Sequence, residues 1–191
     1  MVLVLCIGDL HIPYRATDLP TKFKALLVPG KIHHILCPGN LCIPEIYDYF
    51  KTVCPSLHVT RGQFDTDASK YLDHQVLDIG DFRVGLCHGH QVVPTGDIEA
   101  LAILQRRLNV DILVTGATHE FKAFKYEDRF LINPGSATGA FVQPQGAAAK
   151  PSFVLMDIDG SKATVYVYEL NDQDVKVDKI EFHKPTAPLT T

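Results

Sequence analysis

Five short segments of the sequence carry residue types that bind metal ions. They are Asp9-Leu10-His11, Gly39-Asn40, Gln63-Phe64-Asp65, His88-Gly89-His90 and Gly116-Ala117-Thr118-His119. Carboxylate oxygens and imidazole nitrogens are the donors that Zn²⁺ and similar divalent cations take in proteins. A cation held in this way activates water for hydrolysis or serves as a structural cross-link.

Each of these segments follows a predicted strand. Apolar runs predict strands over residues 2–7, 32–37, 57–60, 82–87 and 111–115. Helical periodicity predicts helices over residues 21–28 and 44–53, and a third helix capped by Asp97. Because ligands collect outside the carboxyl ends of strands in α/β sheets, we expect the five segments to meet at one edge of the fold.

The apolar period changes to two in the later part of the chain. Residues 75–79 and 82–87 predict a strand pair, and residues 121–126 and 129–132 predict a hairpin. Residues 152–158, 163–170 and 175–182 predict a meander. Strand–helix alternation followed by a strand-rich end predicts an α/β fold in which two sheets pack together with helices outside.

Composition limits the class of protein. The 191 residues carry a formal net charge of −4 and no run of Lys or Arg, which argues against nucleic-acid binding. The five cysteines form no CxxC pair, so we expect reduced thiols in a cytosolic protein. No apolar stretch reaches the roughly 18 residues of a membrane-spanning helix. We expect one domain over residues 1–184 and a flexible tail over 185–191.

The order of the segments resembles that of the calcineurin-like metallophosphoesterases. Their pattern is D-x-H, G-D, G-N-H-[DE], H and G-H-x-H, each after a strand of an αββα sandwich of two mixed β-sheets. GDLHIP, HILCPGNLC, GLCHGHQVVP, INPGSATGA and PSFVLMDI resemble, more closely, the phosphoesterase-like subunits of retromer. This likeness runs from residue 8 to about residue 183.

The departures from the pattern change the expected chemistry. Asn40 stands where the family has its bridging Asp, and Gln63 where it has a metal-binding Asn. Phe64 replaces the catalytic His, and Ala117 replaces the first His of G-H-x-H. The resemblance then leaves one metal site of Asp9, His11, Asn40 and His119, and a poorer one of Asn40, His88 and Gln63.

With Asp9 as the sole carboxylate among these ligands, two divalent ions close together would repel each other strongly. We therefore expect no hydrolysis, no required cofactor and at most one weakly held divalent ion, Zn²⁺ or Mn²⁺. Two alternatives remain open. One is a single-metal phosphodiesterase or phosphatase with His88 or His90 as the acid, and the other is a small-molecule binding module. Asp65 is expected to be a turn residue, and His90 to line the pocket or support His88.

The resemblance implies a scaffold role in retromer, a cytosolic coat that recycles transmembrane cargo from endosomes. The expected partner is the C-terminal helical solenoid of the large scaffold subunit (vacuolar protein sorting-associated protein 35), alongside the arrestin-like subunit (vacuolar protein sorting-associated protein 26). Val92 and Val93 are the candidate contacts, unless they pack on the core. The protein would reach endosomal membranes only through its partners.

A second candidate surface comes from strand alternation. In residues 152–158, Val154 and Met156 share one face of the predicted strand, and Phe153 and Leu155 share the other. Both faces are therefore largely apolar. The outer face is either covered by a helix or exposed for partners. The resemblance implies a patch for regulators of endosomal GTPases. Its matching positions are Leu3, Leu26, Leu155, Tyr166, Tyr168 and Val177.

Overall fold

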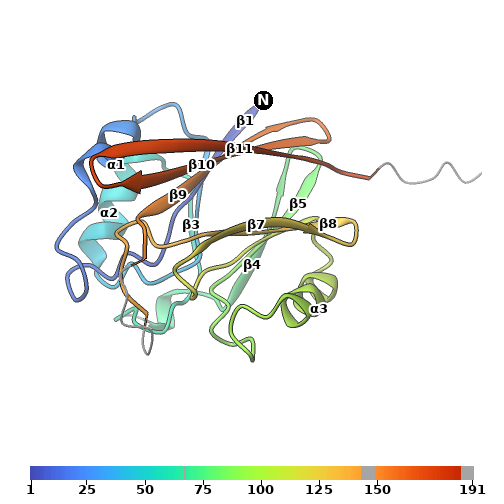
Figure 1. Cartoon of the computed structure of the whole chain (residues 1–191). Helices are drawn as coiled ribbons and strands as arrows, with labels where there is room; N and C mark the ends of the chain where they lie inside the picture. The colour runs from blue at the N-terminus through green and yellow to red at the C-terminus, as the bar shows by residue number, and fades with distance from the viewer. Residues whose placement is uncertain (67, 143–148, 186–191) are drawn as a thin grey trace, which may run out of the picture.

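The computed structural model describes residues 1–66, 68–142 and 149–185 (Figure 1). The strands are β1 (Val2–Cys6), β2 (His34–Cys37), β3 (Leu57–Val59), β4 (His74–Ile79), β5 (Phe82–Cys87), β6 (Ile112–Val114), β7 (Phe121–Tyr126), β8 (Arg129–Pro134), β9 (Ser152–Asp159), β10 (Lys162–Asn171) and β11 (Asp174–His183). The helices are α1 (Thr21–Leu26), α2 (Pro44–Val53) and α3 (Ile98–Leu108), with a short 3₁₀ helix η1 (Ala68–Lys70). None of the described helices is long and apolar enough to span a membrane.

Two sheets form the centre of the fold. The first has six strands in the order β11-β10-β9-β1-β2-β3, and the second has five in the order β4-β5-β6-β8-β7. β1, β2 and β3 pair in parallel in the first sheet, as do β5, β6 and β8 in the second. The remaining strands pair antiparallel. The prediction of two mixed sheets is confirmed.

Strand alternation divides the apolar side chains between two layers. On β1, Val4 and Cys6 face the second sheet and join the core between the sheets, whereas Leu5, and Ile7 directly after the strand, face the helices. Both sets are fully buried. A strand covered on both faces reads as a continuous apolar run, which explains residues 2–7 of the sequence.

Helices cover the outer faces of both sheets. α1 and α2, at the left of Figure 1, bury Phe23 and Phe50 against the six-stranded sheet, and α3 packs against the other sheet. As predicted, Asp97 caps α3, because its Oδ1 accepts the amide hydrogen of Ala100 at 2.9 Å. Asn109 ends α3 in the left-handed region with φ 52°.

The element boundaries differ from the predicted ones by a few residues. α1 ends at Leu26 rather than at residue 28, before Pro29, which cannot continue a helix. β8 extends to Pro134, and η1 was not predicted. Residues 143–148 lie outside the described residues. The same holds for residues 186–191 of the predicted tail.

Candidate functional site

The predicted polar segments meet at the carboxyl ends of the parallel strands. Asp9 and His11 follow β1, Asn40 follows β2, and His88 follows β5. His119 lies in the connection between β6 and β7. All five side chains are buried. The structure thus brings these five predicted residues together, because parallel strands end at the same edge of a sheet.

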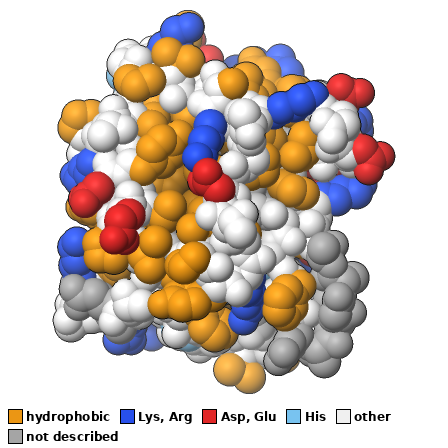
Figure 2. All heavy atoms as spheres, turned by 90° about the vertical axis from the view of Figure 1, so that its left-hand side faces the viewer, with side chains coloured by type: hydrophobic (Ala, Val, Ile, Leu, Met, Phe, Trp, Pro, Cys, Tyr) orange, Lys and Arg blue, Asp and Glu red, His pale blue; other side chains and the backbone are white. Residues whose placement is uncertain are grey.

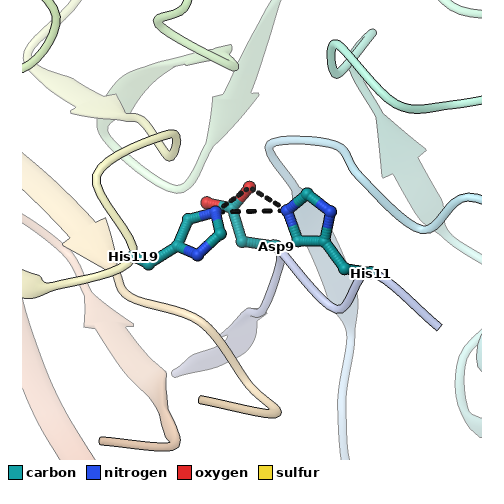
Figure 3. Close-up of side chains that lie close together, drawn as sticks. All are labelled: Asp9, His11 and His119. Atoms are coloured by element: carbon teal, nitrogen blue, oxygen red, sulfur yellow. Dashed lines mark hydrogen bonds and ion pairs between the residues drawn. The ribbon is translucent and has the colours of Figure 1, made fainter. Parts of the chain in front are cut away.

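Asp9, His11 and His119 converge on one point (Figure 3). Asp9 Oδ1 lies 3.8 Å from His11 Nε2 and 3.6 Å from His119 Nε2, and the two nitrogens are 3.1 Å apart. Ligand atoms of a tetrahedral zinc site lie about 2.0–2.2 Å from the ion and hence about 3.3–3.6 Å from one another. The donor set and spacing fit one divalent transition-metal ion.

Hydrogen bonds hold these ligands in place. His119 Nδ1 donates to the carbonyl of Ala140 at 2.7 Å, and its Nε2 faces Asp9 and His11. A backbone partner on the second ring nitrogen is the usual support of a metal-binding histidine. Asp9 Oδ2 accepts the amide hydrogen of Ala117 at 2.8 Å, and Ser136 Oγ donates to the Asp9 carbonyl at 2.7 Å.

The electrostatic surroundings of Asp9 and His11 favour the protonation states of these two residues that metal binding needs. Burial alone would raise the pKa of Asp9, but His88, His119 and Asn40 together lower it below its usual value. For His11, burial and the neighbouring His119, Arg15 and His88 lower the pKa to about 4, against the opposing effect of Asp9. An ionised carboxylate beside a neutral imidazole is the form that binds a cation.

Asn40 lies beside Asp9, as predicted, but it presents its amide nitrogen to the site. Its Nδ2 donates to Asp9 Oδ1 at 2.8 Å and lies 2.7 Å from His88 Nε2. Its Oδ1 accepts the amide hydrogen of Phe64 at 3.0 Å, which fixes the amide in this orientation. The Asn40 amide thus directs a hydrogen-bond donor at Asp9, and coordination of a cation through its oxygen would require the amide to turn over.

His88 approaches the same oxygen of Asp9, Oδ1, that faces His11 and His119. Its Nε2 is 3.1 Å from Asp9 Oδ1, and its Nδ1 is 2.9 Å from His90 Nδ1. His90 therefore supports His88, which agrees with one of the two predicted roles. Gln63 is exposed, unlike every other predicted ligand. The second predicted metal position is thus reduced to His88 and a reversed amide.

Asp65 is a structural residue, as predicted. Its Oδ2 accepts the amide hydrogens of Asn40 and Gly62 at 3.0 and 2.8 Å, and its Oδ1 accepts that of Cys42 at 2.9 Å. These bonds tie the connection after β2 to the connection after β3. A Cβ on Gly62 would lie 2.2 Å from Asn40 Oδ1, so only glycine permits this close approach.

The backbone around the site is strained. Asp9, His11, Asn40, Ala117 and His119 all have positive φ, between 48° and 70°. Non-glycine residues rarely adopt this region, and such strain is concentrated at functional sites. Ala117 is notable because alanine has no polar side chain to stabilise the conformation locally. Ala117 therefore holds this backbone conformation without help from a polar side chain of its own.

Sequence reasoning missed Arg15 and Phe141. The Arg15 guanidinium lies over the Phe64 ring, 4.6 Å from its centroid, and over the Phe141 ring at 5.0 Å. Arg15 Nη1 also donates to the carbonyl of Phe141 at 2.8 Å. The Phe64 ring contacts His11 edge-on at 5.3 Å between centroids. Only the position of Arg15 four residues after His11 could have drawn attention to it.

The two valines near His88-Gly89-His90, Val92 and Val93, differ in how far they are buried. Val92 packs against the cluster under α3, which is the alternative that the sequence left open. Val93 is 83% exposed. Of the pair, only Val93 is available to a partner over most of its side chain.

The predicted regulator patch lies on the outer face of the six-stranded sheet. Leu155 is paired with Tyr166, and Tyr168 with Val177, so these side chains share one face. Phe23 of α1 covers Phe153 on this face, whereas Val177 and Leu26 are 47% and 42% exposed. Both predicted alternatives hold in part, because α1 covers one portion of the face. Figure 2 shows hydrophobic side chains across the side of the molecule that carries α1 and α2, with charged groups between them.

A sandwich of two mixed sheets with outer helices and metal-ligating residues at strand ends defines a metallophosphoesterase-like domain. The calcineurin-like phosphoesterase superfamily domain matches residues 2–161. Vacuolar protein sorting-associated protein 29 of Schizosaccharomyces pombe is 44% identical over 190 residues, covering 96% of this chain and 100% of the relative.

Two solved structures are similar along nearly the whole chain. Vps29 of Chaetomium thermophilum has a TM-score of 0.92 and 42% identity, covering 97% of this chain and 100% of that one. Wild-type Vps29 of Entamoeba histolytica, solved in complex with Zn²⁺, has a TM-score of 0.89 and 45% identity, covering 95% and 100%. The chain therefore belongs to the calcineurin-like phosphoesterase superfamily and, within it, to the family of vacuolar protein sorting-associated protein 29.

Proposed function

We propose that this protein is a non-catalytic scaffold subunit of retromer, folded as one domain over residues 1–184. In this role it binds the C-terminal solenoid of vacuolar protein sorting-associated protein 35, in a complex that includes vacuolar protein sorting-associated protein 26. The observation that carries the proposal is Phe64, whose ring lies against the Arg15 guanidinium and contacts His11 edge-on, where the resembling enzymes place their acid. The identity of the partner is inferred from membership of the vacuolar protein sorting-associated protein 29 family.

The absence of hydrolysis follows from the chemistry of the site. A two-metal esterase needs a bridging anion, ligands for both ions and a proton donor for the leaving oxygen. Asn40 directs an amide donor at Asp9, and Phe64 and Ala117 carry no titratable group. A second cation would meet His88 but no second carboxylate, so electrostatic repulsion between the ions would be uncompensated.

One divalent ion, Zn²⁺ or Mn²⁺, fits Asp9, His11 and His119. It would join the segment after β1 to the segment after β6, and thereby stabilise the surface at the carboxyl ends of the strands. The Zn²⁺ complex of the Entamoeba histolytica relative supports this assignment. The ion is a structural cross-link in this proposal, and binding is weak because a single carboxylate contributes negative charge.

Val93 is the proposed contact for the large subunit, with Val92 positioning it from the α3 cluster. A side chain that is 83% exposed and apolar gains free energy when a partner covers it. The outer face with Leu3, Leu26, Leu155, Tyr166, Tyr168 and Val177 is the proposed site for regulators of endosomal GTPases. The protein would then lie on endosomal membranes through the complex, from the cytoplasmic side.

Calorimetric binding of the full chain to the C-terminal half of the large subunit tests the proposal. We expect tight binding with EDTA and with Zn²⁺ or Mn²⁺. Val93→Asp should weaken it at least tenfold, while the matched variant Val177→Asp on the other face should leave it unchanged. Binding only with metal would keep the scaffold role and give the ion a structural part. No binding under any condition would overturn the retromer assignment.

The intact triad keeps a single-metal phosphodiesterase as a second candidate. In that case the ion on Asp9, His11 and His119 activates water, and the bonded pair His88–His90 supplies the proton. Hydrolysis of bis(p-nitrophenyl) phosphate with Zn²⁺ or Mn²⁺ distinguishes the two functions. Turnover that disappears in His119→Ala would favour the enzyme, whereas no turnover favours the scaffold.

A further inference from the structure

A hollow of about 580 Å³ opens beside the metal-ligating triad. His11, Tyr14, Arg15, Phe64, Thr66 and Phe141 line it. Its rim is aromatic and accessible, because Tyr14 is 66%, Phe64 45% and Phe141 37% exposed. Exposed aromatic rings around an arginine are typical of the residues that contribute most to protein–protein binding.

Arg15 is held rigidly in this hollow. Two aromatic rings cover its guanidinium, and one of its Nη atoms donates to the Phe141 carbonyl. The other N–H groups at the edge of the guanidinium have no recorded protein acceptor within residues 1–66, 68–142 and 149–185. No carboxylate within these ranges forms an ion pair with it, whereas Arg61 pairs with Asp73 and Arg106 with Glu127.

A fixed cation without a counter-ion is suited to bind an oxyanion. Its side-chain conformation is already restricted, so binding a carboxylate costs little further entropy. A divalent ion on the triad would add to the positive potential of the hollow.

We propose that Arg15, fixed between Phe64 and Phe141, binds a carboxylate side chain of the partner polypeptide that docks over the hollow. The inference rests on the proposed function and names the chemistry by which the partner is recognised there. It also assigns a purpose to Phe64. Phe64, which stands where the resembling enzymes have their catalytic acid, provides one of the two aromatic rings that hold Arg15.

The test measures the affinity of the full chain for the C-terminal half of the large subunit at low and high salt. Arg15→Met should weaken binding roughly tenfold or more and reduce its salt dependence, because a hydrogen bond to a charged group is lost. Arg15→Lys keeps the charge without the flat stacking surface. Its affinity should lie between those of the wild-type protein and Arg15→Met. Arg83→Met is the matched control, since exposed Arg83 lies near the start of β5 and the site lies beyond its end.

A parallel titration of the isolated protein with inorganic phosphate and with succinate distinguishes a free anion from a partner carboxylate. Phosphate bound through Arg15, together with unchanged complex formation in Arg15→Met, would overturn the proposal in favour of a free-anion site. Unchanged affinity of a folded Arg15→Met for the large subunit would overturn it while the scaffold function stands. If the wild-type protein does not bind, both fail. Phe64→Leu is a second variant, which keeps Arg15 and should weaken binding less.

Discussion

The two halves of the polar site differ in the arrangement of their donor atoms. Asp9, His11 and His119 keep donor atoms within 4.8 Å of one another, on backbone segments that hold them in a strained conformation. Around Asn40 and His88, the amide is reversed and Gln63 is exposed. The donor atoms of one half can therefore converge on a single point while those of the other half do not. This is so because each half depends on different loops.

The largest expected effect is on Zn²⁺ affinity, which a substitution in one half should lower far more than a substitution in the other. His119→Ala should weaken Zn²⁺ binding at least about 100-fold, because it removes a ligand, whereas His88→Ala should cost about tenfold or less, as for an outer partner of Asp9. Calorimetric titration with Zn²⁺ measures both. Equal losses would mean that His88 is also a ligand and that the halves are equivalent.

Asn40→Asp tests whether the reversed amide is what excludes a second ion. Without metal, the new carboxylate would face Asp9, and the lost donors and like-charge repulsion should lower the free energy of unfolding by about 1–3 kcal/mol. Added Mn²⁺ or Zn²⁺ should then raise the melting temperature more than it does in wild type. Gln63→Glu adds the same charge at an exposed position and is the control. A variant as stable as wild type without metal would contradict the argument.

The lowered pKa of His11 predicts a pH dependence in the intact half. Its pKa is about 4 in the folded protein against an ordinary 6.5, so the unfolded chain binds the proton more tightly. Stability should therefore fall as pH decreases from 6.5 to 4, by roughly 1–3 kcal/mol. Urea unfolding in EDTA measures this loss. His11→Gln should flatten the curve in this window, whereas the exposed His33→Gln should not.

The smallest effect is expected at Gln63. Because this side chain is exposed, Gln63→Ala should change Zn²⁺ affinity by less than about twofold and leave stability within about 0.5 kcal/mol. The titration used for His119→Ala serves as the measurement. A clear loss of affinity would show that Gln63 turns inward when metal binds, and would restore it as a ligand of the second half.

Much of the architecture followed from the sequence because local rules operate there. α2 occupies residues 44–53 as its periodicity predicted, and Asp97 caps α3 as its side chain allows. Asp65 was recognised as a turn residue from its type and surroundings. Boundaries such as the end of α1 were less accurate, because packing and neighbouring prolines, rather than periodicity, set them.

The sequence by itself determined the order of strands and helices, and it placed Asp9, His11, Asn40, His88 and His119 at the ends of strands. Side-chain period and residue type carry that information. The tertiary structure alone decided the orientation of the Asn40 amide. It also decided that Val92 is partly buried while Val93 is exposed, and that Arg15 stacks between Phe64 and Phe141. Each of these depends on contacts between segments distant in sequence, such as Arg15 and Phe141, whose positions are 126 apart. No local pattern encodes which loop will lie opposite another.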